Sequence, residues 1–336
     1  MNIKFNIIYT PGNAKYLRLF VLSLLKWSDC NFRIVINGCG DKEKKLLEQF
    51  CEKYSRLEYF VLPYDEMLLH GDALAYLQKK EESDYFCFMD SDIFVTGNFM
   101  NEFSPYLNQY SGIFSGSAIW LSEQDQILEK SNMRMGGRFH WTNDNFCLGS
   151  SFFAIYNNKI LTQLLKDTGV TFDKYSSWQK LPPKFKQDIV ELDLKKNAYD
   201  TGKIINLLLQ SHGNKILYIN SKTLCHLGGL SSLKIGPLSK VPPKGIKRFR
   251  KNISRFTSVR NWRNKDRMRE KEYQSNVKYN RFDTAEYFSN ILRSLFENQP
   301  ITATLNISDQ TEAKKIQFAR HHIEALYDEF KNELIQ

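Results

Sequence analysis

The stretch that decides the fold reads YFCFMDSDIFV and covers residues 85–95. Five aromatic or apolar residues precede Asp90, and three more apolar residues follow Asp92. Such a run is typical of a buried strand that ends at the edge of a sheet. Because residues i and i+2 of a strand share a face, Asp90 and Asp92 are expected to project together from that edge. The stretch therefore predicts a strand that delivers two carboxylates to one place.

Strand and helix patterns alternate on the N-terminal side of this stretch. The pattern predicts strands at 5–9, 32–36 and 59–62, and helices at about 14–27, 41–54 and 70–80. This alternation predicts an α/β, Rossmann-like fold, in which a mostly parallel sheet is flanked by helices. Ligands of such sheets bind beyond the carboxyl ends of the strands. The residues that end the predicted strands, among them Asn37 and Ser91, are therefore candidates for ligand contact.

The second half of the chain is less regular, with a small helical region at its end. Strands are expected at 112–121, 146–156 and 215–220, and the strand at 215–220 is expected to be the last of the chain. Helices are expected at 157–167, from about 201, at 283–297 and at 309–334. A loop is expected around Pro182-Pro183. We divide the chain into an α/β domain at 1–232, a basic linker at 233–275 and a helical C-terminal region at 276–336.

Charge is concentrated in the linker. The net charge is +10, yet the segment from Lys234 to Lys271 holds 14 Lys or Arg against Asp266 and Glu270. Aromatic residues are interleaved with these charges, which suits an anionic membrane surface, a solvated face or nucleic acid. We prefer the membrane surface, and nucleic acid is the weakest of the three.

The sequence shows no sign of export or of membrane insertion. The apolar run at 17–25 is far too short to span a bilayer, and residues 1–5 do not resemble a signal peptide. The six cysteines lack Cys-x-x-Cys spacing, so reduced thiols are expected. We therefore expect a cytoplasmic protein, peripheral to the inner face of a membrane if the linker binds lipid.

Two carboxylates at a sheet edge suit a hard divalent cation. Mg²⁺ and Mn²⁺ prefer carboxylate, phosphate and water ligands, so one or two protein carboxylates suffice. Such an ion can stabilise the charge that grows on a departing diphosphate when a sugar is transferred from a nucleotide. Asp90 and Asp92 are therefore predicted metal ligands. A solvated turn is the alternative interpretation.

The same region resembles the donor half of GT-A glycosyltransferases, in particular bacterial enzymes of the family 2 type. The resemblance rests on residues 13–37, on His70-Gly71-Asp72-Ala73-Leu74, and on 86–99 around the Asp-x-Asp motif. It extends more weakly to 148–153, Asp200 and 226–229. It implies a metal-dependent enzyme that moves a sugar from a nucleotide-sugar donor, UDP-linked, to a carbohydrate or lipid-linked acceptor, in polysaccharide biosynthesis.

The resemblance also implies roles for single residues. Tyr9 and Thr10 would contact the nucleoside, and Asp72 would lie near the base or ribose. Asp200 would be the carboxylate base of an inverting reaction, with Asp144 as the second choice. Each of the first four has a plainer interpretation: a strand end for Tyr9 and Thr10, a helix N-terminal turn for Asp72, and an N-cap for Asp200.

A late His and two glycines complete the expected site. In similar enzymes a late His, here His226, completes the metal site or touches the diphosphate, but a structural hydrogen bond would explain it equally. Gly228 would let the backbone approach phosphate, or would simply make a turn. Aromatic residues at Trp120 and 139–141 flank the expected acceptor cleft, although core packing is their commoner role.

Two other classes of protein remain to be distinguished. A haloacid-dehalogenase-type phosphatase also follows an apolar strand with Asp-x-Asp and would use Asp90 as nucleophile. Phe94 stands where that class has Thr or Val, and no later Asp-Asp pair occurs. A non-catalytic carbohydrate- or nucleotide-binding protein is the third possibility. Metal titration separates it from the enzyme.

Overall fold

The computed structural model describes most of the chain. It covers residues 3–335 except 130, 131, 133, 173–180, 195, 197, 231–275, 306 and 308. The basic segment 234–271 thus lies outside the described residues. Within the described part, no helix combines the length and the apolar character that a bilayer crossing requires.

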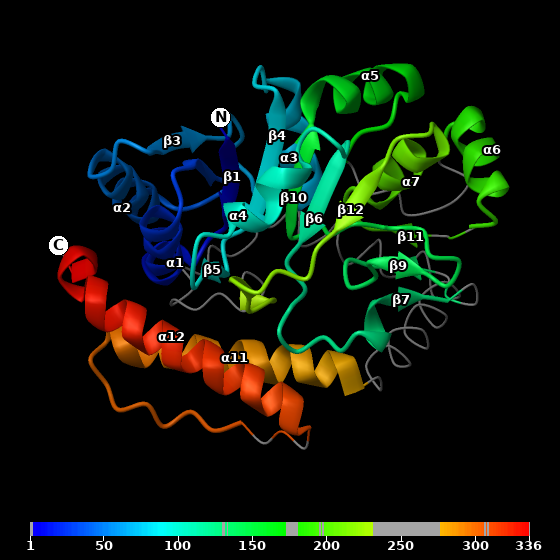
Figure 1. Cartoon of the computed structure of the whole chain (residues 1–336). Coiled ribbons are helices and arrows are strands. Elements are labelled where there is room, and N and C mark those ends of the chain that lie inside the picture. The colour runs from blue at the N-terminus through cyan, green and yellow to red at the C-terminus, as the bar shows by residue number, and fades with distance from the viewer. Residues whose placement is uncertain are drawn as a thin grey trace, which may run out of the picture.

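The centre of the molecule is a seven-stranded sheet with the order β12-β6-β10-β4-β1-β2-β3 (Figure 1). Its strands are β1 (Lys4–Tyr9), β2 (Asn31–Ile36), β3 (Leu57–Val61), β4 (Tyr85–Asp90), β6 (Gly112–Ser115), β10 (Phe153–Asn157) and β12 (Ile216–Tyr218). Only β10 runs antiparallel to its neighbours in this sheet, β4 and β6. The prediction of a mostly parallel α/β sheet is therefore confirmed.

Alternate residues of the strands enter two separate cores, one on each face of the sheet. On β1, Phe5, Ile7 and Tyr9 belong to one core, and Ile8 belongs to the other. This is the period of two that a strand imposes. The first core, defined as the face of Phe5, is covered by α1 (Ala14–Trp27) and α2 (Asp41–Glu52). The opposite core is covered by α3 (His70–Lys79), α5 (Asn158–Thr168), α6 (Pro183–Glu191) and α7 (Lys203–Ser211).

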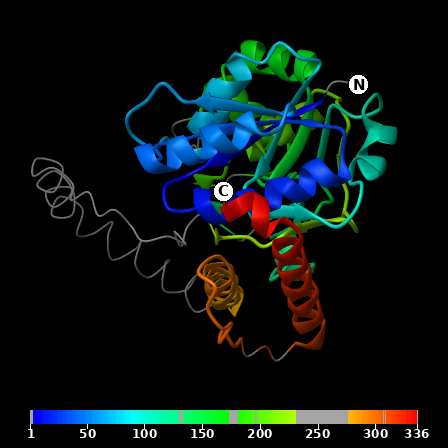
Figure 2. The same cartoon turned by 90° about the vertical axis from the view of Figure 1, so that its left-hand side faces the viewer.

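The C-terminal region folds as two helices, α11 (Asn276–Phe296) and α12 (Gln310–Ile335), which pack under α1 (Figures 1 and 2). Both predicted helices are present, although α11 begins earlier. Phe288 of α11 and Ile323 of α12 are fully buried in the first core. Lys26 pairs with Glu329 at 2.7 Å. The helices therefore share a core with the sheet, while the boundaries at 232 and 275 stay predictions.

Short elements around the sheet depart from the sequence prediction. The strands expected at 112–121 and 146–156 are shorter, because Gly116 and Gly149 turn the backbone at positive φ (+86° and +66°). The proline-marked loop contains α6, with Pro183 at its first turn, where a missing N–H costs nothing. The strand at 215–220 is not the last, since β13 (Leu224–His226) follows it.

Candidate functional site

The Asp-x-Asp motif lies at the carboxyl end of β4, as predicted. Asp90 is the last residue of β4, and its N–H donates to the Phe152 carbonyl at 2.7 Å. The chain then turns through Ser91 and Asp92 into the short strand β5 (Ile93–Val95). Asp90 keeps 28% of its side chain exposed, whereas Asp92 keeps 3%. The two carboxylates therefore reach one site from an open and a buried side.

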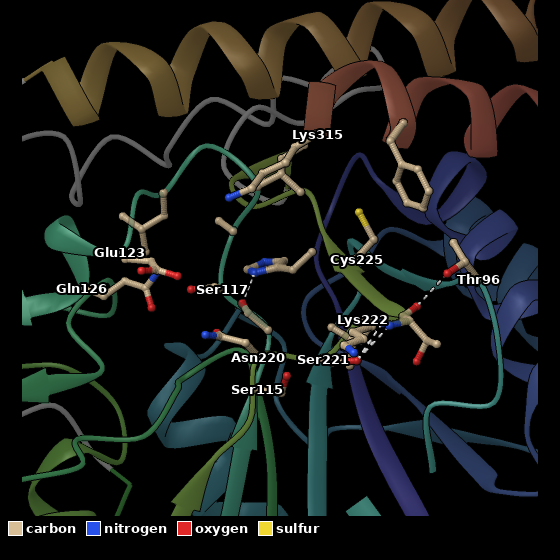
Figure 3. Close-up of a pocket in the computed structure, with 18 of the residues that line it drawn as sticks. Thr96, Ser115, Ser117, Glu123, Gln126, Asn220, Ser221, Lys222, Cys225 and Lys315 are labelled. Atoms are coloured by element: carbon tan, nitrogen blue, oxygen red, sulfur yellow. Dashed lines mark hydrogen bonds between the residues drawn. The ribbon is translucent and has the colours of Figure 1, made fainter. Parts of the chain in front are cut away.

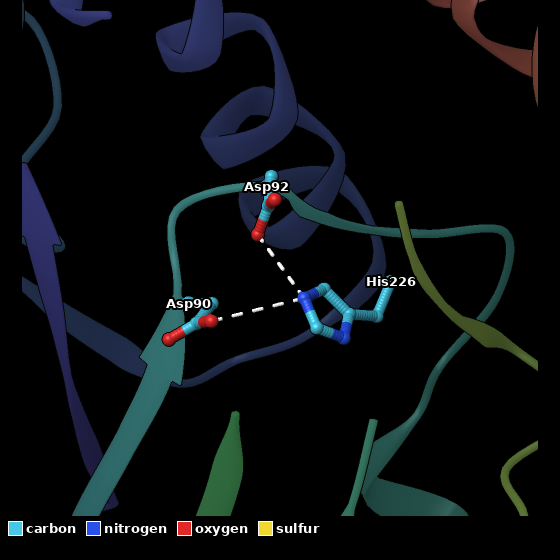
Figure 4. A group of neighbouring side chains, drawn as sticks. All are labelled: Asp90, Asp92 and His226. Atoms are coloured by element: carbon cyan, nitrogen blue, oxygen red, sulfur yellow. Dashed lines mark ion pairs between the residues drawn. The ribbon is translucent and has the colours of Figure 1, made fainter. Parts of the chain in front are cut away.

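Strand pairing brings His226 to these carboxylates. β13 runs antiparallel to β5, with His226 opposite Ile93, and the Leu227 N–H donates to the Asp92 carbonyl at 3.1 Å. His226 Nε2 lies 3.2 Å from Asp92 Oδ1 and 3.7 Å from Asp90 Oδ2 (Figure 4). One ligand atom from each of the three residues fits within 4.8 Å of the others. The expected late His therefore joins the cluster across 134 residues of sequence.

The Gly116 carbonyl sets the tautomer of His226. Its Nδ1 lies 2.6 Å from the Gly116 carbonyl, which can only accept a hydrogen bond, so Nδ1 carries the proton. In the neutral ring, Nε2 then presents a lone pair to the two carboxylates. Nε2 is buried, and its polar contacts are the carboxylate oxygens of Asp92 and Asp90. A backbone carbonyl behind a histidine is the usual support of a metal ligand, so these residues fit a divalent cation.

Electrostatics also favour a cation here. Burial and the charge of Asp92 raise the pKa of Asp90 to about 8. Burial opposes the ionised form of Asp92, but His226 and the Leu230 N–H outweigh it and lower the Asp92 pKa. Burial likewise opposes the His226 imidazolium, yet Asp92 raises the His226 pKa above its ordinary value. The site draws positive charge toward itself.

Asp200 lies beside this cluster. It follows β11 (Ala198–Tyr199), which pairs with β8 (Arg134–Met135), and its N–H donates to the Met135 carbonyl at 2.8 Å. Burial lowers the pKa of His70, and the charge of Asp200 acts against this. Asp200 also adds to the raised Asp90 pKa, after burial and Asp92. The chain thus folds to bring Asp200 near His70 and Asp90.

The N-cap interpretation of Asp200 is wrong. Helix α7 begins at Lys203, its N-cap is Gly202 with φ +75°, and no side chain caps it. The Asp200 carboxylate instead accepts the N–H of Thr201 at 2.9 Å. A left-handed Gly202 stands between Asp200 and the helix, so the carboxylate belongs to the loop before it.

His70 is a site residue that sequence reasoning did not assign. It begins α3, and its Nε2 lies 3.8 Å from Asp90 Oδ1, whereas His226 approaches the other oxygen of that carboxylate. The signal was present, since His70 opens the His-Gly-Asp stretch of the resemblance. Asp72 lies in the first turn of α3 and is partly exposed. Its contact with the donor stays a prediction.

Of the residues predicted to contact the donor, Tyr9 and Asn37 have buried side chains, and Thr10 is partly exposed. Tyr9 is fully buried in the first core, so its side chain faces away from the open edge. Asn37 is 2% exposed, and its amide group both donates to the Leu68 carbonyl at 3.0 Å and accepts the Leu68 N–H at 2.8 Å. Thr10 is partly exposed and accepts from Asn13 Nδ2 at 3.4 Å.

The remaining predicted residues, Ser91, Gly228 and Asp144, differ in how far they are exposed. Ser91 is 6% exposed within the turn between the two aspartates. Gly228 has φ +74°, and a Cβ there would lie 2.7 Å from Ala118 Cβ and 2.8 Å from Trp120 Nε1. The turn and these neighbours are enough to require glycine. Asp144 lies exposed in the turn that follows β9 (Trp141–Thr142).

Core packing explains most of the aromatic residues expected at the acceptor cleft. Trp120, Phe139 and His140 expose 8%, 7% and 0% of their surface. The His140 ring stacks on Tyr218 at 4.6 Å between centroids. Only Trp141 of this group is partly exposed.

Lys203 is a buried residue that no sequence signal identified. Its Nζ donates to the Phe139 carbonyl at 2.6 Å and to the Gly149 carbonyl at 2.7 Å. Burial lowers its pKa to about 8. Lys203 thereby ties the loops at 136–140 and 146–152 to the start of α7, three residues after Asp200.

Comparison with known families gives a match over the first half of the chain. Residues 7–165 match the family described as "Glycosyl transferase family 2", a range that contains the Asp-x-Asp motif and His70. Comparison with curated proteins finds no match.

Solved structures give distant likenesses. S. aureus TarS is 14% identical, with a TM-score of 0.39 over 71% of this chain and 41% of that chain. The TarS fragment 1–349 is 14% identical, with a TM-score of 0.42 over 98% of this chain and 92% of the fragment. The galactosyltransferase LgtC, solved with donor and acceptor sugar analogues, is 13% identical. Its TM-score is 0.38, over 65% of this chain and 73% of that chain. The chain thus spans about two fifths of the first TarS structure, and these likenesses are too distant to assign a substrate.

Proposed function

Because residues 7–165 match glycosyltransferase family 2 and the Asp-x-Asp motif lies at the edge of the sheet, we propose that this chain transfers a sugar from a UDP-linked donor to a carbohydrate or lipid-linked acceptor. Mn²⁺ or Mg²⁺ held by Asp90, Asp92 and His226 would bind the diphosphate. The observation that carries this proposal is the position of the buried Nε2 of His226, which lies 3.2 Å from Asp92 Oδ1 and 3.7 Å from Asp90 Oδ2. An imidazole nitrogen beside two carboxylates is a set of ligands that suits such a cation.

The three ligands divide the work. A divalent cation bound here would neutralise negative charge that develops on the departing diphosphate. Asp92 is fixed by the Leu230 N–H at 3.1 Å, and His226 is fixed by Gly116. Asp90 is the most exposed of the three and stands between His226 and His70. It therefore faces the side from which a donor can approach.

Asp200 is the proposed base of an inverting reaction. Its carboxylate would take the proton of the acceptor hydroxyl while that oxygen bonds to the anomeric carbon. The bond from this carbon to the diphosphate oxygen breaks in the same step, and the configuration inverts. Its electrostatic effect on His70 and Asp90 supports the proposal, as does the loss of the capping explanation. Asp144 lies in an exposed turn, so we propose it as the base less readily than Asp200.

The donor nucleoside would lie along the ends of β1 and β2. Thr10 and Asp72 are partly exposed there and are the proposed side-chain contacts. Tyr9 would contribute through its backbone, since its side chain is buried. Asn37 would support the loop before α3, and Ser91 and Gly228 would shape the turns around the metal ligands.

Membrane docking is a further part of the proposal. A lipid-linked acceptor would place the enzyme on the cytoplasmic face, and the segment 234–271 carries the charge for anionic lipid. Sedimentation with anionic vesicles should succeed at low salt and fail at high salt. Changing Lys247, Arg248, Arg250 and Lys251 together to Gln should release the protein. Equal binding to neutral vesicles would contradict the electrostatic role.

A panel of nucleotide sugars tests the reaction. We expect Mn²⁺-dependent release of nucleoside diphosphate from one UDP-sugar, slowly into water and faster with a suitable acceptor. Asp90→Ala should abolish it. Hydrolysis of p-nitrophenyl phosphate instead would point to a phosphatase, and metal-dependent binding without turnover would point to a binding protein.

A further inference from the structure

A cavity of about 500 Å³ lies between α12 and the loops that follow β6 and β12 (Figure 3). We call it the α12 cavity. Residues 115–119 and 220–226 form one wall, and Lys314, Lys315 and Phe318 of α12 form the other. Glu123 and Gln126 close one side. The helical C-terminal region therefore contributes one wall of a cavity that is large enough for a ligand.

The inner end of the cavity is polar and buried. Ser115 and Gln126 expose 1% and 6% of their surface, and Ser117, which is partly exposed, is drawn near them in Figure 3. Gln126 Oε1 and Ser117 Oγ lie 2.9 and 3.3 Å from His140 Nδ1, so both are held in place. Hydroxyl and amide groups fixed in this way suit the hydroxyl groups of a sugar.

The mouth of the cavity is cationic. Lys222, Lys314 and Lys315 are exposed around it, and Glu123 is the one carboxylate among its lining residues. In the part of the chain that the structure describes, no salt bridge reaches any of these three lysines, and the charge of Lys315 acts on Glu312 of α12. The side chain of Phe318, 48% exposed, adds an aromatic surface beside them. A ligand that is both polyhydroxylated and anionic matches this combination.

The cavity adjoins the metal ligands without containing the metal site. Gly116 and His226 line it, and the hydrogen bond between them faces away from the carboxylates. A ligand in the cavity would lie behind His226, close to the reaction centre but not in the donor's place. That position fits a part of the acceptor remote from the reacting hydroxyl.

We propose that the α12 cavity binds an acidic segment of the acceptor glycan, with its hydroxyl groups at Ser117 and Gln126 and its anionic groups at the three lysines. The anionic groups are phosphate or carboxylate. This inference rests on the proposed glycosyl transfer and adds an acceptor class to it. It also gives α12 a role in binding as well as in packing.

Binding to the full chain tests the proposal. Isothermal titration would use a hexagalacturonate, a glycerol phosphate hexamer and neutral maltohexaose. We expect binding of at least one acidic oligomer and none of maltohexaose at the same concentrations. Lys314→Gln with Lys315→Gln should weaken acidic binding by about tenfold, because charged contacts are lost. The matched control is Lys159→Gln with Lys166→Gln on α5, which lies at the end of the molecule opposite to α12 (Figure 1); it should leave the affinity unchanged.

The two acidic probes separate the sources of charge. Binding of the uronate alone assigns carboxylate, and binding of the phosphate oligomer alone assigns phosphate. Equal binding of maltohexaose, no binding of either acidic oligomer, or unchanged affinity in the α12 variant would overturn the proposal. UDP binding with Mn²⁺ is measured in parallel. If the α12 variant loses UDP affinity, the cavity serves the donor and the acceptor assignment is wrong, while the glycosyltransferase assignment stands.

Discussion

Asp92→Asn separates a metal ligand from a structural carboxylate. Asp92 is 2% exposed, and its Oδ2 accepts the Leu230 N–H at 3.1 Å. Asparagine has the same size and keeps an oxygen for this N–H, so the turn should survive. What it loses is the charge, 3.2 Å from His226 Nε2. We expect a folded protein with a much weaker cation site.

The size of the effect follows from ligand linkage. A cation at 100 times its Kd stabilises the native state by about 2.7 kcal/mol. Unfolding 336 residues involves an entropy of about 0.7 kcal/mol/K, so the Tm should rise by about 4 °C. Losing even a supporting partner of a metal weakens affinity by about 10–100-fold. A 100-fold loss leaves about 0.4 kcal/mol, a rise below about 1 °C.

Thermal unfolding with and without Mn²⁺ measures this difference. Asp328→Asn is the matched control, because that carboxylate is exposed on α12, far from the metal ligands in sequence, and pairs with Lys331 at 3.4 Å. The control should keep the wild-type rise. If Asp92→Asn also keeps it, Asp92 does not hold the ion and the reasoning fails.

Three further predictions concern the base, the turn and the proton. Asp200→Asn should lower turnover by about 10²–10⁴-fold with donor affinity unchanged, as single-turnover kinetics would show; unchanged turnover would exclude Asp200 as base. Gly228→Ala should destabilise the fold by more than about 1 kcal/mol, measured by urea unfolding, because its Cβ would clash with Ala118 and Trp120; wild-type stability would contradict this. Since the raised pKa of Asp90, about 8, means that a proton competes with Mn²⁺, affinity measured by titration should rise from pH 6 to pH 8 and then level. A flat profile would show that Asp90 is not a ligand.

The sequence predicted the sheet because its signal was local. The apolar run before Asp90 and the strand–helix alternation are patterns of neighbouring residues, and they position the motif at the sheet edge. The metal assignment of His226 came from resemblance alone. The contact that explains it, the Gly116 carbonyl at 2.6 Å, joins residues 110 apart and has no sequence signature.

Errors arose where short elements depend on tertiary contacts. Strand β13 has three residues and exists because β5 pairs with it, so no pattern announces it. Asp200 is a good N-cap residue by type, but Gly202 starts the helix two residues later. Ile323 of α12 lies in the core beneath the sheet, a contact that has no sequence signature, and the domain boundaries at 232 and 275 stay predictions.

The most direct test of the central claim is anomalous diffraction at the manganese edge from crystals soaked with Mn²⁺ and UDP. We predict one strong peak within coordination distance of Asp90, Asp92 and His226 Nε2, with the UDP diphosphate against it. A peak elsewhere, or UDP bound with no ion at these residues, would contradict it.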